Sequence, residues 1–498
     1  MDSRRVSHPL FLLAFLLVML TGCSSPALPL DDRLKQVWHE EEIFIDNSKT
    51  ITDAHFLRRL SLDLTGLPPT PAAIRAFLKD KSPDKRAKMV DKLLAGDEFA
   101  AYQAHLWGDE LRIKSEFPIN LWPNAVQRYS RYVYETMRDN VPYDRFAREL
   151  LTASGSNFRI PAANFFRAAA DRTPKGLAQV TSLTFFGKNL ADWSVREQEQ
   201  FIPFFSCIGY KSSKEWKEEF VFFRPPAPEA EAITAAVPGR KKVTVPQGTD
   251  PRQVLADEII ASDLFAEAMV CRAWRRLFGK EPDTPSFSVL RREMAARFRT
   301  SGFDLRQLYR EILLSRAYSL PPGTPEEENV FAAYPIRRLN AEQISDRLSM
   351  VLRKPFETYS SVIPEPFTFL PPGTRAGAIE DGSISSPFLD LMGKPPRDSG
   401  SPEERKEELT GKQKLFLMNS GKLYREIQRS QRYFLQNKTT FRNRLDNVYM
   451  TVLARPITPA ETALIEKKYQ STPAKQRGQF WTDLLWALVN SNEFIYQF

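Results

Sequence analysis

The stretch 56–80 reads FLRRLSLDLTGLPPTPAAIRAFLKD and contains the pattern that predicts the fold. Its first part ends at a turn, and Thr70-Pro71 then opens a second segment with hydrophobic residues at helical spacing. A small polar residue followed by proline is typical of a helix start, because the polar side chain caps the first turn and proline fits the first helical position. The stretch therefore predicts two helices joined by a short turn.

The same signal recurs along the chain. Ser82-Pro83 precedes DKRAKMVDKLL, and Thr458-Pro459 precedes AETALIEKKY. Glu461 lies three residues after the threonine of the second pair and completes a capping box, as Gln343 does for Asn340. Hydrophobic residues at helical spacing follow in further segments, for example Leu305, Leu308, Ile312 and Leu313.

Strand signals are sparse by comparison. KKVTV at 241–245 is one, and AIEDGSI at 378–384 contains Asp381-Gly382, which is typical of a hairpin. The segment 225–251 is rich in Pro and Ala and indicates a linker or a long surface crossing between domains. We therefore predict a mainly α, multi-helical fold with at most a small β-hairpin or sheet. Its two helical domains would cover residues 45–224 and 252–498.

The N-terminus has the features of a bacterial lipoprotein signal. Two arginines precede the apolar segment 9–19, which is too short to span a bilayer as a mature helix. LTGC at 20–23 resembles a lipobox, so residues 1–22 would be a signal peptide and Cys23 would carry the lipid. An ordinary secretory peptide that ends in cysteine is the alternative.

The lipid would anchor the protein in the bacterial cell envelope. Ser24 rather than aspartate follows the lipidated residue, and by resemblance to known lipoprotein sorting this favours the outer membrane. Residues 23–44 would then form a tether and a first helix.

The chain is basic, with 70 Lys and Arg against 61 Asp and Glu and a formal charge of +9. An exported protein rarely meets nucleic acid and no run of five basic residues occurs, so we expect no nucleic-acid partner. Attraction to anionic lipid head groups or to an acidic polysaccharide is one interpretation of the charge. An ordinary mixed-charge surface is the other.

After Cys23, the remaining cysteines are Cys207 and Cys271. They could form a disulfide in an exported protein, or they could be two buried thiols in apolar surroundings. No two histidines stand at i, i+4 spacing, so a histidine-based metal site is not expected. The histidines of the mature chain are His39, His55 and His105.

The stretch 56–71 resembles the paired domains of unknown function 1549 and 1553, which occur together in envelope proteins of planctomycetes and their relatives. Further matching motifs in the first domain are WGDELR (107–112), WPNAVQRY (122–129), VPYDRF (141–146) and NFFR (164–167). Those in the second include VCRAWRRLFGK (270–280), YPIRRLNAEQISD (334–346), GTRAGAIEDGSISSPFLDLMGKPPR (373–397) and LLWALVNSNEF (484–494). The resemblance covers about residues 45–498 and implies an envelope protein whose chemistry is uncharacterised.

Two departures from this family bear on cofactors. Many relatives carry Cys-x-x-Cys-His-x-His-Pro after the LTFFG-like stretch, and some carry a cytochrome c domain, but here 183–193 contains neither Cys nor His. Relatives also tend to have cysteines after the GKPPR-like motif, where this chain has DSGSPEERKEE (398–408). Haem and thiolate metal sites need those ligands, so we expect no metal and no cofactor.

A His-Asp-Arg set lies on one predicted helix, where His105, Asp109 and Arg112 are spaced by about one turn each. The set could be a general acid/base group with an anion clamp. It could equally be a structural network of ion pairs that fastens the helix.

Aromatic residues and arginines also gather between residues 107 and 143. Sugar-binding surfaces combine such rings with charged hydrogen-bonding groups, and so do ordinary helical cores with polar rims. The candidate binding residues are Trp107, Trp122, Asn124, Tyr129, Arg131 and Arg375.

The sequence lacks the nucleophile elbow, the phosphate loop, the dinucleotide fingerprint and the His-Glu-x-x-His motif. We therefore expect a membrane-anchored binding or scaffold module, with an envelope protein or a polysaccharide as partner. The alternative is a polysaccharide-processing enzyme or an accessory protein of sulfated-glycan degradation, since the family tends to occur near sulfatase-like partners. Asp109 with Glu110 or Glu149 would then be its carboxylates.

Overall fold

The structure is a computed structural model that describes residues 29–46, 48–282, 284–436 and 439–498. The predicted signal peptide and Cys23 lie outside the described residues. Within the described ranges the chain is mainly helical and its sheets have two or three strands, which confirms the predicted fold class. No helix in these ranges is long and apolar enough to cross a membrane.

The helices and strands run as follows. The first half contains α2 (Pro29–Glu40), α3 (Asp53–Thr65), α4 (Pro71–Lys79), α5 (Lys85–Leu94), α6 (Asp97–Glu110), α7 (Trp122–Arg138), α8 (Tyr143–Thr152), α9 (Asn164–Arg167), α10 (Pro174–Phe186) and α11 (Val195–Phe201). The second half contains α12 (Pro251–Ala261), α13 (Asp263–Phe278), α14 (Ser288–Thr300), α15 (Leu305–Leu313), α16 (Pro325–Asn329), α17 (Ala341–Leu352), α18 (Pro387–Leu391), α19 (Gly411–Asn419), α20 (Gly421–Leu435), α21 (Phe441–Val452), α22 (Pro459–Ser471), α23 (Arg477–Val489) and α24 (Asn492–Ile495). The strands are β1 (Gly155–Ser156), β2 (Ile208–Ser212), β3 (Glu219–Phe223), β4 (Thr234–Ala235), β5 (Val243–Thr244), β6 (Arg337–Arg338) and β7 (Tyr496–Gln497).

Most of the predicted helix starts are confirmed. The Thr70 side chain caps α4, and the predicted capping boxes begin α17 and α22. The start at Ser82-Pro83 is wrong, because α5 begins at Lys85. Ser82 donates its backbone N–H and its hydroxyl to the Asp80 carboxylate, so the serine closes a turn instead of capping the helix.

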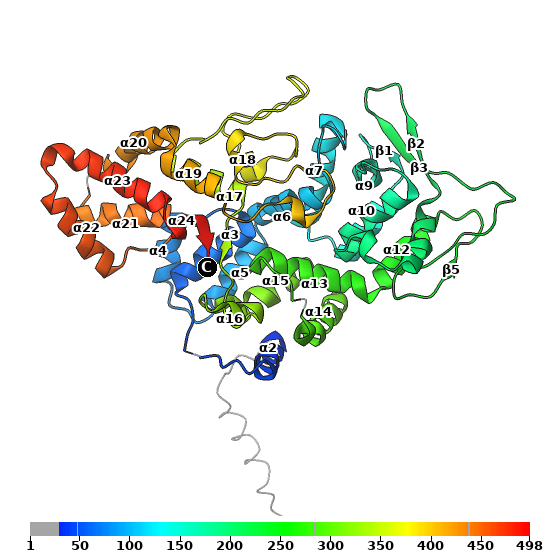
Figure 1. Ribbon diagram of the computed structural model, residues 1–498, viewed down its shortest axis with the longest axis horizontal. Coiled ribbons are helices and arrows are strands. Elements are labelled where there is room, and N and C mark those ends of the chain that lie inside the picture. Colours follow the sequence, from blue (N-terminus) through cyan, green and yellow to red (C-terminus); the bar gives the residue numbers. More distant parts are fainter. Residues whose placement is uncertain (1–28, 47, 283, 437–438) are drawn as a thin grey trace, which may run out of the picture.

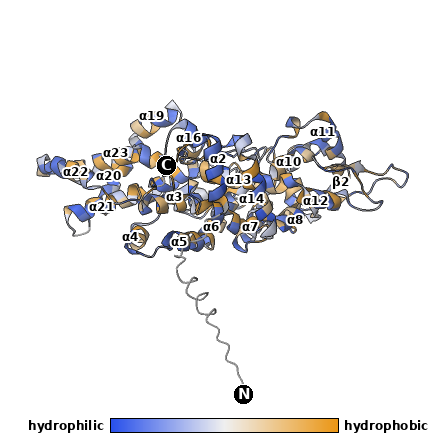
Figure 2. Cartoon of the chain, turned by 90° about the horizontal axis from the view of Figure 1, so that it is seen from below, coloured by the Kyte–Doolittle hydropathy of each residue, from blue (hydrophilic) through white to orange (hydrophobic). Residues whose placement is uncertain are grey.

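Hydrophobic packing divides the chain near residue 335. One core joins α2–α15, and a second core is built mainly from residues 339–495. Figure 1 shows α20–α23 as a lobe on one side, β1–β3 with α8–α12 on the other, and α3, α6 and α13 between them. Seen from below, the body is elongated and flat, with polar and apolar residues alternating along its helices (Figure 2). The predicted domain limits at 45–224 and 252–498 therefore do not coincide with the division of the hydrophobic cores.

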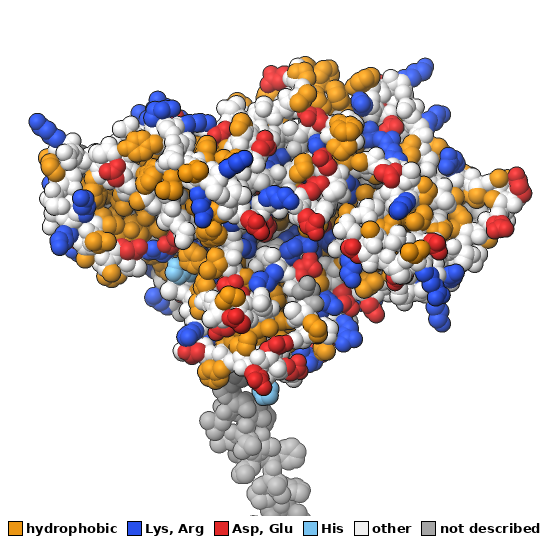
Figure 3. Space-filling view, in the orientation of Figure 1, with side chains coloured by type: hydrophobic (Ala, Val, Ile, Leu, Met, Phe, Trp, Pro, Cys, Tyr) orange, Lys and Arg blue, Asp and Glu red, His pale blue; other side chains and the backbone are white. Residues whose placement is uncertain are grey.

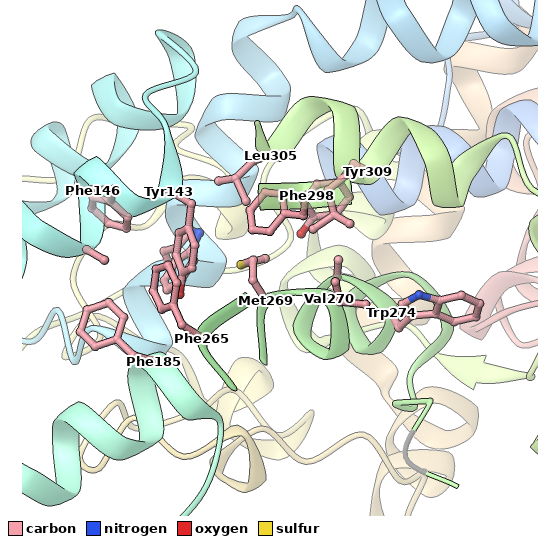
Figure 4. Close-up of a cluster of buried hydrophobic side chains, with 14 of the residues drawn as sticks. Tyr143, Phe146, Phe185, Phe265, Met269, Val270, Trp274, Phe298, Leu305 and Tyr309 are labelled. Atoms are coloured by element: carbon pink, nitrogen blue, oxygen red, sulfur yellow. The ribbon is translucent and has the colours of Figure 1, made fainter. Parts of the chain in front are cut away.

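Aromatic rings fill the centre of the larger core. Figure 4 shows Tyr143 and Phe265 facing each other, with Met269, Phe298 and Leu305 beside them. The first two rings stack with centroids 4.7 Å apart. Helices α8, α10, α13, α14 and α15 meet around this cluster, so residues far apart in sequence share one packed interior.

The sheets correct two sequence predictions. The segment 241–245 does contain β5, which pairs antiparallel with β4. The segment 378–384 contains no strand among its described residues, because the Asp381 carboxylate accepts hydrogen bonds from the backbone N–H groups of Ser115 and Ser383 and ties the turn to another loop. A three-stranded antiparallel sheet of order β1-β3-β2 was not predicted.

The two cysteines of the described residues are free thiols, which is one of the two arrangements that the sequence left open. Cys207 is buried after α11, and Cys271 is partly buried on α13. Burial raises the pKa of the Cys271 thiol to about 12. This thiol is therefore protonated and unreactive near neutral pH.

Candidate functional site

A cavity of about 460 Å³ lies where α6, α13, β6 and the segment 395–407 meet. We call it the central cavity. Charged groups dominate its lining, which includes Asp63, Tyr102, Asp109, Glu110, Asn189, Arg275, Arg276, Arg337, Arg338, Asn340, Glu403, Arg405 and Glu407. Figure 3 shows acidic and basic side chains interleaved near the middle of one face of the molecule.

Asp109 is the centre of a buried network of ion pairs. Arg397 Nε lies 2.8 Å from Asp109 Oδ1, and Arg405 Nη2 lies 2.7 Å from Asp109 Oδ2. Arg405 also bridges to Glu342 through Nη1, 2.6 Å from Oε2. His105 Nε2 lies 3.4 Å from Glu342 Oε1. One guanidinium thus joins carboxylates from α6 and α17.

The arginines keep both carboxylates ionised. Burial by itself would raise the pKa of Asp109, but Arg405 and Arg397 outweigh it and lower the pKa. Burial would also raise the pKa of Glu342, but Arg405 outweighs it and holds this pKa well below its usual value. A catalytic acid needs a raised pKa, so this pair of carboxylates has the properties of a structural and electrostatic unit.

A second network is centred on Glu110, the residue next to Asp109 on α6. Glu110 Oε2 lies 2.6 Å from Arg272 Nε, and its Oε1 lies 2.9 Å from Arg276 Nη2. Both guanidinium groups also lie 4.9 Å from the centroid of a Trp107 ring. The two networks together fix α6 to α13 and α17.

Arg338 differs from the other arginines of the central cavity. Arg275, Arg276, Arg337 and Arg405 are each paired with a carboxylate. Arg338 donates to the backbone carbonyls of Met392, Lys406 and Glu407, and it has no carboxylate partner within the described ranges. Its Nη1 is buried without a hydrogen-bond partner among the described residues. Among the described residues this guanidinium thus forms no ion pair with a carboxylate, although the Glu407 and Glu342 carboxylates act on it at longer range.

Both halves of the chain contribute to this cavity, and both halves match a known family. Residues 29–189 match the family described as Protein of unknown function (DUF1549), and residues 251–469 match Protein of unknown function (DUF1553). The chain belongs to the tandem DUF1549–DUF1553 proteins. This confirms the resemblance to the paired domains that the sequence motifs indicated. No curated protein and no solved structure matches the chain.

The DUF1549 region contributes the predicted His-Asp-Arg set, but the structure brings only two of the three together. His105 and Asp109 share Arg397, whose Nη2 lies 3.1 Å from the His105 carbonyl. The Arg112 guanidinium is fully buried and donates to the carbonyls of Glu110, Phe165 and Ala168. This geometry favours the structural interpretation of Arg112 over an anion clamp.

The DUF1553 region supplies the partners that sequence reasoning missed. Arg397 and Arg405 lie 288 and 296 residues away from Asp109 in the chain. No local spacing could link them. The only sequence signal was the motif 373–397, which ends in one of these arginines.

The predicted aromatic binding residues are dispersed in the tandem fold. Trp107 and Tyr129 lie in the core, whereas Trp122 is half-buried and contacts the rings of Trp216 and Phe367. The remaining candidates lie elsewhere on the surface: Asn124 and Arg131 are exposed on α7, and Arg375 is half-buried before the short turn at Ala376–Ala378. They do not form a single site.

The described residues contain no group of three or more His, Cys, Asp or Glu side chains arranged to hold a metal ion. Asp109 and Glu110 of the central cavity pair with arginines instead, as does Asp63, where Arg337 and the Tyr318 hydroxyl donate to the carboxylate.

Proposed function

We propose that the protein is a lipid-anchored binding module of the bacterial cell envelope, and that its central cavity binds an acidic group of an envelope ligand. The observation that supports the binding role is Arg338. A carboxylate or a sulfate would match this buried guanidinium, because its Nη1 has no hydrogen-bond partner among the described residues and can donate to an anionic oxygen.

The three carboxylates that could serve a polysaccharide-processing enzyme are all bound to other side chains, which favours binding over catalysis. Asp109 and Glu110 are each held by two arginines. Glu149 accepts a hydrogen bond of 2.8 Å from Tyr132 and pairs with Arg145 on α8. No two of these three carboxylates are arranged as a free acid and a free base among the described contacts. We therefore prefer the binding module to a polysaccharide-processing enzyme.

Calorimetric titration of the full chain in detergent tests the binding role. The probes are a sulfated chondroitin disaccharide, its unsulfated uronate form and a neutral disaccharide. We expect binding of the two acidic probes only, and Arg338→Gln should weaken it at least about ten-fold, which corresponds to about 1.4 kcal/mol.

Arg429→Gln is the matched control, because Arg429 is an exposed arginine on α20 that pairs with Glu426. This variant should bind like the natural protein. Equal binding by Arg338→Gln, or the absence of binding to either acidic probe, would contradict the cavity assignment.

The anchor is tested separately. The lipobox-like LTGC at 20–23 supports acylation of Cys23, and two or more acyl chains hold a protein stably on a bilayer. Mass spectrometry of the N-terminal peptide should find an acylated Cys23, and Cys23→Ala should release the protein from the membrane fraction. An unmodified cysteine in membrane-bound protein would refute the anchor.

A further inference from the structure

A group of aromatic side chains lies where α7 begins. Figure 1 shows this helix near the upper edge of the molecule. Three segments build it: the loop 113–122, the turn between β2 and β3, and the segment 360–371. Its rings are Trp122, Trp216, Phe367 and Phe369, which we call the aromatic platform. We propose that the aromatic platform binds an acidic polysaccharide by stacking against its sugar rings.

The platform is exposed to solvent although it is apolar. The side chains of Trp216, Phe367 and Phe369 are 69%, 54% and 60% exposed. The Trp122 ring lies 6.3 Å from Trp216 and 5.5 Å from Phe367, measured between centroids. Hydrophobic side chains also gather at the upper edge of the space-filling view (Figure 3). Contiguous exposed rings of this kind indicate a binding surface.

Hydrogen bonds hold the platform in place. The Ser115 and Glu116 N–H groups donate to Asp381 Oδ1 and Ser383 Oγ, each over 3.0 Å. Glu116 Oε1 accepts the Val362 N–H over 2.9 Å and so joins two of the three segments. Trp122 has a φ of 68°, which a bulky residue rarely adopts. The fold thus maintains a strained backbone that presents this ring, as is frequent at binding sites.

The surroundings of the rings fit a sugar polymer. Trp122 and Phe367 directly precede Pro123 and Thr368, which line a cavity of about 290 Å³. That cavity also presents polar side chains that can hydrogen-bond to hydroxyl groups, namely Gln127, Thr374 and Glu380. Apolar ring faces beside a few polar groups are typical of sugar recognition.

Basic side chains set the charge of the ligand. Lys217 Nζ lies 5.5 Å from the centroid of the Trp216 ring, and Lys211 and Lys214 are exposed on the same hairpin. Glu215 is the exposed acid between them. Glu116 and Glu365 lie in the other two segments, so the basic excess is confined to the hairpin. This side of the platform favours a polymer that carries carboxylate or sulfate groups.

The position of the platform argues against a lipid surface as its ligand. Helix α2 lies at the lower edge of Figure 1, opposite the platform. Five residues separate Cys23 from Pro29, and the extended chain between them spans at most about 20 Å. If the proposed anchor holds, α2 stays near the membrane and the platform faces away from it. A polymer outside the membrane is then the ligand within reach.

Affinity electrophoresis of the full chain in detergent tests this proposal, with alginate as the acidic polymer and dextran as the neutral one. We expect retardation in alginate only. Trp216→Ala should weaken it at least about ten-fold, because exposed aromatic residues dominate such interfaces. Lys214→Gln/Lys217→Gln should weaken it as well. Leu464→Ala is the control, because Leu464 is 72% exposed on α22, away from the platform.

Several outcomes would overturn the proposal. Two of them concern alginate: no retardation of the natural protein, or the same retardation for Trp216→Ala as for the natural protein. The other two would assign the surface to another partner: binding of phosphatidylglycerol vesicles that requires Trp216, or a dimer in sedimentation that dissociates in Trp216→Ala. Measuring the retardation in the Arg338→Gln background separates this site from the central cavity, because Trp216→Ala should still weaken the retardation there. Failure of one site therefore does not decide the other.

Discussion

Replacing Arg405 by methionine should destabilise the protein strongly. Arg405 is largely buried and donates to both Asp109 and Glu342. After the replacement, Asp109 keeps its ion pair with Arg397, but Glu342 keeps only His105 at 3.4 Å. The side chain of Glu342 is 1% exposed, so a buried carboxylate remains that no arginine neutralises among the described residues. Such a loss costs about 3–5 kcal/mol of the free energy of unfolding.

Urea unfolding monitored by tryptophan fluorescence measures this cost, because the chain has 8 tryptophans. Arg405→Lys is the first control. It keeps the charge but cannot bridge two carboxylates with a planar fork, so we expect a loss of about 1–2 kcal/mol. The second control is Glu342→Gln/Arg405→Met, which removes the orphaned charge and should regain most of the stability.

The pH dependence provides a further check. In Arg405→Met, burial would raise the pKa of Glu342 above its value in the unfolded chain. The folded state then binds a proton more readily, so the loss of stability relative to the natural protein should be smaller near about pH 5 than near about pH 8. A loss below about 1 kcal/mol, or the same loss at both pH values, would refute the buried-charge argument.

Three further changes test other parts of the fold. Arg455 lowers the pKa of Glu461 to about 2, so the ionised Glu461 stabilises the folded state. The difference in stability between the natural protein and Glu461→Gln should be full above about pH 4.3 and should vanish as the pH falls towards 2. Acid titrations of both proteins measure this difference, and a pH-independent difference would contradict the argument. Phe265→Ala empties the centre of the larger core and should cost about 3–5 kcal/mol in urea unfolding, whereas a cost below about 1 kcal/mol would show that the rings of Figure 4 are loosely packed. Gly66→Ala adds a Cβ 2.8 Å from the Tyr102 ring, at a residue with a φ of 70°. Gly302 is the control, because it has a φ of 72° but no atom within 4 Å of an added Cβ. Gly66→Ala should therefore lower the stability by at least about 1 kcal/mol more than Gly302→Ala, and equal losses would mean that the ring moves freely.

The helical architecture could be predicted because its signals are local. Thr70 and the pair Thr458 and Glu461 act on backbone groups within one turn of themselves. A small polar residue does not cap a helix where another neighbour binds its side chain. Ser82 is an example, because its hydroxyl donates to the Asp80 carboxylate. The Asp381-Gly382 turn failed for a different reason, since the carboxylate bonds to Ser115, a residue far away in the chain.

The candidate site could be predicted only in part. His105 and Asp109 were recognised because they share a helix face, but their arginine partners are nearly three hundred residues away. Trp122 was recognised as an aromatic candidate, whereas its contacts with Trp216 and Phe367 come from two other loops. Pair contacts of this kind depend on how helices and loops pack, which the spacing within one segment does not encode.

The sequence by itself determined the helical class, several helix starts and the membership in the tandem family, because capping, periodicity and ordered motifs are properties of neighbouring residues. The tertiary structure decided which charges are neutralised and which rings remain exposed. Arg112 and Arg338 are both buried arginines held by carbonyls, yet only Arg338 lines the central cavity. Burial and the choice of partner depend on the whole fold, since the free energy of a charge is set by every group around it.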